Sequence, residues 1–174
     1  MPITLHPILC NAIFLVALYS HIDWAMAQND PQKGTQPVCA PASSLRAPQL
    51  YGVWQATFTR PPAGLPARAL VLLEKHEEFS DSLAGIVSRE GGLPDTSATL
   101  AGHAARAALA GDIEDGLLVL DESSNNISIS GTWNGQVTEG SCGRQIKGVW
   151  RDTSASAPPD SPDVAFTLTR RSGW

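Results

Sequence analysis

The sequence predicts an all-β protein, a single eight-stranded antiparallel up-and-down barrel. From Leu50 onward, short segments alternate apolar and polar residues, which is the pattern of a strand with one buried face. A Gly-x-Trp pattern occurs three times on these segments, at residues 52–54, 131–133 and 148–150. Short turns separate the segments, and closing such a meander into a barrel removes the exposed edges that an open sheet would have.

The first half of the barrel is expected to contain five strands. Residues 50–59 form the first, with Trp54, Ala56 and Phe58 on one face. Pro61 and Pro62 end it, because proline donates no backbone hydrogen bond to a sheet. Residues 67–75 and 83–88 follow as the second and third strands. The turn at residues 114–116 then indicates a hairpin between strands at 109–113 and 117–122.

The second half of the barrel begins with the strictest alternation in the chain, over residues 127–137. Ile127, Ile129 and Trp133 are expected to point inward there. Gly131 and Gly135 share that face, where a missing side chain leaves room for a neighbouring indole. Strands at 144–152 and 164–171 complete the barrel.

One segment departs from the β pattern. Residues 96–108 are rich in alanine, with no proline and no β-branched run after Thr99. Alanine has the highest helix propensity. We therefore expect a short helical insertion between the third and fourth strands.

The N-terminal region predicts export. Residues 8–19 form an almost entirely apolar stretch. Its length suits the apolar region of a signal peptide and is too short to span a bilayer. Ala25-Met26-Ala27 matches a signal-peptidase site, so residues 1–27 are expected to be removed. Residues 28–49 are interpreted as a flexible N-terminal arm before the barrel domain of residues 50–174. We expect a secreted or periplasmic protein with no membrane span after signal removal.

Two cysteines, Cys39 and Cys142, remain after signal removal. Oxidising compartments favour a disulfide between them. The bridge would close a loop of about 100 residues, for which the chain-entropy model gives at most about 4.7 kcal/mol. A metal site would have only His76 and His103 as further partners, and neither lies at ligand spacing from a cysteine.

Composition and motifs argue against nucleic-acid binding and catalysis. The net charge is −5, whereas nucleic-acid-binding proteins carry basic patches. His76, Glu77, Glu78 and Asp81 could form a cation site or an acid/base pair, but a solvated loop is the better explanation of them. Ser141 lacks the strand-to-helix turn of a nucleophile elbow. We expect no catalytic residue, no metal and no cofactor.

A Gly-x-Trp on the first strand and an arginine on the last resemble the calycin superfamily, which includes lipocalins, fatty-acid-binding proteins and avidins. The resemblance implies that Trp54 packs at the closed end of the barrel beneath Arg170. Residues 131–152, with Trp133 and Trp150, also look like the penultimate hairpin of avidin-like barrels. The polar biotin-contacting residues of avidins and the later lipocalin motifs have no counterpart here.

Two functions follow as expectations. The first is a binding module that takes a small apolar ligand in the barrel mouth, with Phe58, Trp133 and Trp150 as its wall. The second is a protein-interaction module whose partner is a secreted or periplasmic protein. The chain resembles small periplasmic inhibitors of bacterial metalloproteases, which are also eight-stranded barrels and insert an N-terminal arm into the protease. Residues 28–49 would be that arm.

Overall fold

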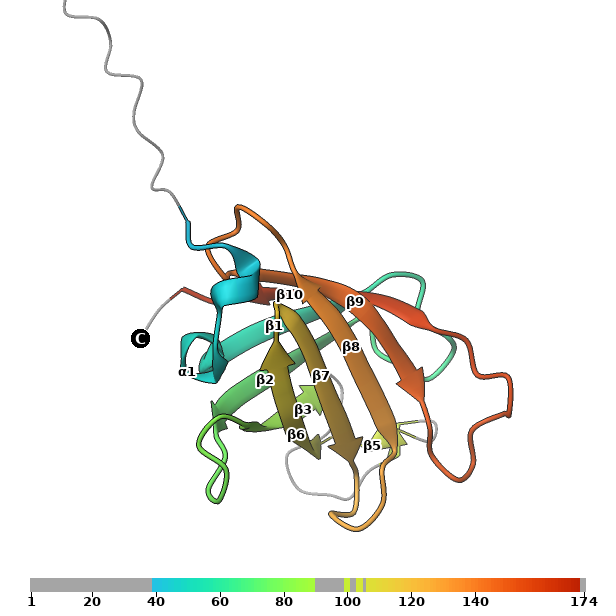
Figure 1. Cartoon of the computed structure of the whole chain (residues 1–174). Helices are drawn as coiled ribbons and strands as arrows, with labels where there is room; N and C mark the ends of the chain where they lie inside the picture. The colour runs from blue at the N-terminus through green and yellow to red at the C-terminus, as the bar shows by residue number, and fades with distance from the viewer. Residues whose placement is uncertain (1–38, 90–98, 101–102, 105, 173–174) are drawn as a thin grey trace, which may run out of the picture. The chain divides into compact units, whose positions relative to one another are not determined.

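Eight antiparallel strands close into a barrel in the computed structural model of the chain (Figure 1). The structure describes residues 39–89, 99–100, 103–104 and 106–172, all within one compact unit, Gln36–Trp174. Each strand pairs with its sequence neighbour in the barrel, and β1 also pairs with β10 to close it. The barrel strands are β1 (Gly52–Phe58), β2 (Arg68–Lys75), β3 (Leu83–Arg89), β6 (Arg106–Glu114), β7 (Leu117–Ser123), β8 (Gly131–Val137), β9 (Gln145–Asp152) and β10 (Val164–Arg170).

The predicted fold class is confirmed, whereas the expected helical insertion is wrong in the part of 96–108 that is described. There, β4 (Thr99–Leu100) pairs with β5 (His103–Ala104), and β6 begins at Arg106. Ala107 lies in the barrel core opposite Val87 of β3. Pairing with strands on both sides overrides the helix propensity of alanine, and the small side chains fit a narrow interior.

Strand β8 begins four residues later than predicted. Ile127 and Ile129, expected inside, are 89% and 48% exposed in the loop that precedes Gly131. The Asn125 side chain causes this difference, because its Oδ1 accepts hydrogen bonds from the backbone N–H groups of Ile127 and Ser128, both at 2.9 Å. Such local side-chain bonds compete with strand pairing.

Glycine on the inner face of β8 makes room for aromatic rings. A Cβ atom added at Gly131 would lie 2.7 Å from Trp150 Nε1. One added at Gly135 would lie 2.7 Å from Ile146 Cγ2 and 3.1 Å from Phe166 Cζ. Any larger residue at either position would therefore displace the core, as the alternation of glycine and tryptophan predicted.

One end of the barrel, here called the capped end, is covered by the segment before β1. This segment contains a 3-10 turn, η1 (Ala42–Ser44), and one helical turn, α1 (Ala47–Leu50). Ala42, Leu45, Ala47 and Leu50 are buried in the core. The structure thus differs from the prediction of an arm over residues 28–49, since residues 42–49 are part of the folded cap. The predicted signal peptide and residues 28–38 lie outside the described residues.

Arg170, the last residue of β10, joins the cap to the first and last strands of the barrel. Its guanidinium lies 5.8 Å from the ring centre of Trp54, and it donates hydrogen bonds to the backbone carbonyls of Gln49 at 2.7 Å and Tyr51 at 2.5 Å. The Trp54 indole N–H donates to the carbonyl of Leu50 at 2.8 Å. This is the packing of Trp54 under Arg170 that the calycin resemblance implied.

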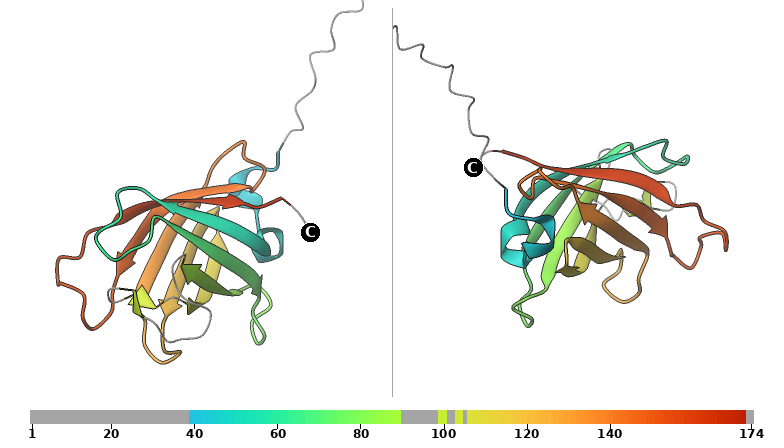
Figure 2. Two further views of the ribbon diagram at one scale, coloured as in Figure 1. Left: turned by 180° about the vertical axis from the view of Figure 1, so that it is seen from behind. Right: turned by 45° about the horizontal axis from the view of Figure 1, so that its top comes forward.

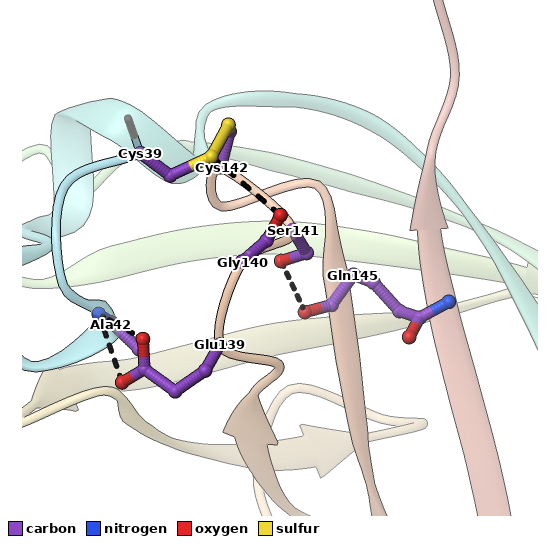
Figure 3. The surroundings of a disulfide bond; sticks show 7 residues. All are labelled: Cys39, Ala42, Glu139, Gly140, Ser141, Cys142 and Gln145. Carbon is purple, nitrogen blue, oxygen red and sulfur yellow. Dashed lines mark hydrogen bonds between the residues drawn. A yellow bond between two sulfur atoms is a disulfide. The ribbon is translucent and has the colours of Figure 1, made fainter. Parts of the chain in front are cut away.

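The predicted disulfide between Cys39 and Cys142 is confirmed and lies at the capped end (Figure 3). It links the start of the cap to the β8–β9 loop. Next to it, both carboxylate oxygens of Glu139 accept a hydrogen bond from the backbone N–H of Ala42, at 3.2 and 3.3 Å. The cap is therefore held covalently and by side-chain hydrogen bonds.

Replacing Arg170 by alanine should lower the free energy of unfolding by about 2–3 kcal/mol, because two hydrogen bonds and a cation–π contact are lost. Urea unfolding followed by tryptophan fluorescence measures the change. Arg171→Ala is the matched control on the neighbouring exposed side chain and should change stability by less than about 0.5 kcal/mol. Equal losses for the two variants would contradict a specific role of Arg170.

Candidate functional site

The end of the barrel opposite the cap, here called the loop end, carries the two long loops 59–67 and 153–163. Loops 59–67, 124–130 and 153–163 all leave the barrel there. Figure 2 shows loops 59–67 and 153–163 projecting from the same end, away from α1. β3 ends and β6 begins at the same end of the barrel.

Four aromatic side chains pack together inside the barrel at the loop end. The Phe58 ring lies 5.4 Å from that of Trp133 and 6.2 Å from that of Trp150, between ring centres. The Trp133 and Phe166 ring centres are 5.0 Å apart. All four residues are buried. The structure thus brings together the three residues predicted as a ligand wall, and their rings contact one another.

A buried carboxylate lies directly beside these rings. Glu122 Oε2 accepts hydrogen bonds from Trp133 Nε1 at 3.0 Å, from Trp150 Nε1 at 3.1 Å and from an Arg89 guanidinium nitrogen at 2.7 Å. The Arg89 and Glu122 side chains are 0% and 4% exposed. A carboxylate without partners would be very costly to bury, so these three donors are what allow it to lie in the core.

Arg89 and Glu122 were not among the residues that the sequence pattern singled out. The signal was present, because Glu122 has the same parity as the inward Leu118 and Leu120, and Arg89 the same parity as Val87. The predicted strands end at residues 88 and 122, so Arg89 lies just beyond one strand and Glu122 is the last residue of the other. Buried tryptophans usually donate their indole N–H to an acceptor, and the predicted interior contained Trp133 and Trp150 but no acceptor for them. A polar residue on an inward-facing strand position was therefore to be expected.

A half-open hollow of about 240 Å³ lies at the loop end, between loops 59–67 and 153–163. Buried Trp150 forms its base, and two side chains, Asp152 and Ser161, give it polar character. The rest of the lining is apolar, namely Pro62, Ala63, Pro158, Pro162 and Val164. Pro62, interpreted from the sequence only as part of a strand break, and the prolines of loop 153–163 therefore form walls of a pocket.

An exposed ion pair joins the two ends of loop 153–163. Arg151 Nε donates to Asp163 Oδ1 at 2.7 Å, and this hydrogen bond and the charge of Asp163 raise the pKa of Arg151 above its ordinary value. Asp152 Oδ1 accepts a hydrogen bond from the backbone N–H of Ser154 at 2.9 Å, which fixes the start of the same loop.

The other candidate residues have local structural roles. His76 Nδ1 accepts hydrogen bonds from the backbone N–H groups of Glu78 and Phe79, at 3.2 and 3.3 Å, in the β2–β3 loop. Ser141 Oγ donates to the Gln145 carbonyl (Figure 3). The side chain of His103 lies outside the described residues. Within the described part of the chain, no group of three or more His, Cys, Asp or Glu could hold a metal ion.

The eight-stranded closed antiparallel barrel is compatible with a calycin-like architecture. No protein-family model matches the chain, and no curated protein matches its sequence. None of the helices in the described ranges has the length and apolar character needed to span a bilayer.

Replacing Glu122 by glutamine should lower the free energy of unfolding by about 3–5 kcal/mol, because the buried Arg89 charge is left uncompensated. Adding Arg89→Met should recover part of this loss, since the glutamine carbonyl can still accept both indole N–H groups. Asp121→Asn, on the exposed face of β7, is the matched control. Urea unfolding gives all four values, and a double variant no more stable than Glu122→Gln would show that the two side chains are not coupled.

Proposed function

We propose that the protein is a non-catalytic binding module that takes a small, largely apolar ligand in the hollow at the loop end. The observation that carries this proposal is the apolar lining of the hollow above Trp150. Binding sites for small molecules are typically concave and mostly apolar, with a few polar groups that fix orientation. The two polar side chains of the lining, Asp152 and Ser161, fit that description.

The size of the hollow limits the ligand. Pockets for drug-sized molecules measure roughly 300–1,000 Å³, and this one measures about 240 Å³. The barrel interior below it contains the packed rings of Phe58, Trp133 and Phe166. A ligand would therefore contact Trp150 directly, with Phe58 and Trp133 supporting that ring from inside the barrel.

Rigidity of the base favours binding without rearrangement. Trp150 is held by its hydrogen bond to Glu122 and by the Arg89 guanidinium, which lies 5.7 Å from its ring centre. A site whose side chains are already fixed loses less conformational entropy when the ligand enters.

Titration with 2-phenylethanol, a small and mostly apolar neutral probe, should shift the Trp150 indole N–H signal in ¹H–¹⁵N NMR spectra and reach saturation. Ala63→Phe should abolish the shift, because Ala63 lines the hollow and a phenyl ring there would fill it. Ala67→Phe, on the same loop but outside the lining, is the matched control and should bind as the unaltered protein does. A shift that survives Ala63→Phe would place the probe elsewhere. The proposal would be refuted if neither this probe nor charged analogues of the same ring and length gave a saturable shift that Ala63→Phe abolishes.

A second candidate is protein binding through the N-terminal arm, and the packed aromatic interior favours it, since a filled barrel acts through its surface. The Cys39–Cys142 bridge fixes the start of the cap at the capped end, opposite the hollow. The two candidates therefore use different ends of the barrel and can be separated by truncation.

Deleting residues 28–38 should leave 2-phenylethanol binding unchanged, because the hollow is built from loops 59–67 and 153–163 and the adjoining ends of β9 and β10. The same pair of proteins is assayed for inhibition of a purified secreted bacterial zinc metalloprotease. We expect no inhibition by either. Inhibition by the full mature chain that the deletion abolishes would favour the second candidate.

A further inference from the structure

We propose that the ligand of the loop-end hollow is a small amine, with its protonated nitrogen bound to Asp152 and its apolar body against Trp150 and the prolines. This inference rests on the proposed function, since it takes the hollow as the binding site. It adds the charge and the chemical class of the ligand.

Asp152 carries a charge that no other group of the hollow compensates. It ends β9, is half-buried, and lines the hollow. Among the described residues the ion pairs are Arg89–Glu122 and Arg151–Asp163, so no basic side chain lies within ion-pair distance of Asp152. Its Oδ1 accepts one backbone hydrogen bond, from Ser154. A carboxylate can accept several, so Asp152 retains capacity for a further donor.

The lining as a whole selects for positive charge. Asp152 is its one ionisable side chain, and the lining contains no lysine, arginine or histidine. Arg151, next in sequence to Asp152, is paired with Asp163 and so is not available to attract an anion. Asp160 on loop 153–163 and Arg60 on loop 59–67 are further charged residues of these loops, and neither of them lines the hollow.

The apolar walls make the carboxylate more selective than it would be in open water. Pro62, Pro158 and Pro162 reduce the solvent around Asp152 when a ligand fills the hollow. Charge-assisted hydrogen bonds strengthen as water is excluded. An anionic ligand would instead meet an uncompensated like charge. An amine with an apolar body matches both parts of the lining, whereas a purely apolar molecule leaves the carboxylate desolvated and unpaired.

Three probes with the same ring and nearly the same length test this. These are 2-phenylethylamine, 2-phenylethanol and phenylacetate, titrated at neutral pH into the mature protein and followed by the Trp150 indole N–H signal. The amine should bind about tenfold more tightly than the alcohol, the factor expected for one hydrogen bond to a charged group. Phenylacetate should bind most weakly.

Asp152→Asn should remove the advantage of the amine over the alcohol. The asparagine Oδ1 can still accept the Ser154 N–H, so the loop is expected to keep its structure, and the urea unfolding midpoint checks this. Asp160→Asn is the matched control in the same loop, and it should keep the tenfold preference.

The outcomes separate this inference from the proposed function. If the alcohol binds as tightly as the amine, or if the preference survives Asp152→Asn, the assignment of an amine to Asp152 is overturned while the hollow remains a binding site. If none of the three probes binds in a way that Ala63→Phe abolishes, both proposals fail.

Discussion

The buried contact on which the loop end depends is the Glu122 carboxylate with its three donors. One oxygen atom joins Arg89 of β3, Trp133 of β8 and Trp150 of β9 to β7. Because a buried carboxylate tolerates no missing partner, the contact fixes the relative positions of these four strands at the loop end. The same contact also fixes the position of the Trp150 ring, which is the base of the hollow.

The two ends of the barrel are built differently. At the capped end, the disulfide, Glu139 and Arg170 each attach the segment before β1 to the barrel. At the loop end, loops 59–67 and 153–163 are long, and the walls of the hollow between them consist largely of proline and small residues. Proline limits the backbone freedom of such loops, so a pocket can keep its shape without being part of the core.

Alternation in the sequence predicted the eight strands and their order, and the two cysteines of an exported chain predicted the pairing of Cys39 with Cys142. Alternation failed where side chains compete with the pattern. Asn125 diverts the backbone before β8, and long-range pairing makes alanine-rich β6 a strand. The tryptophans were recognised as central, but Glu122 was not, because a polar residue at a strand end is usually solvated. The hollow could not be predicted, since it depends on how two loops distant in sequence lie against each other.

Closure of the barrel has a consequence for how the chain must be made. Strand β10 pairs with β1, and Tyr51 and Arg170, which bond across this seam, are 119 residues apart in sequence. Contacts of such separation form slowly, because the chain between them must first be ordered. Until the last strand is synthesised, β1 and β9 each present an unpaired edge. A chain shortened by its final ten residues would expose both edges permanently and would be prone to aggregate.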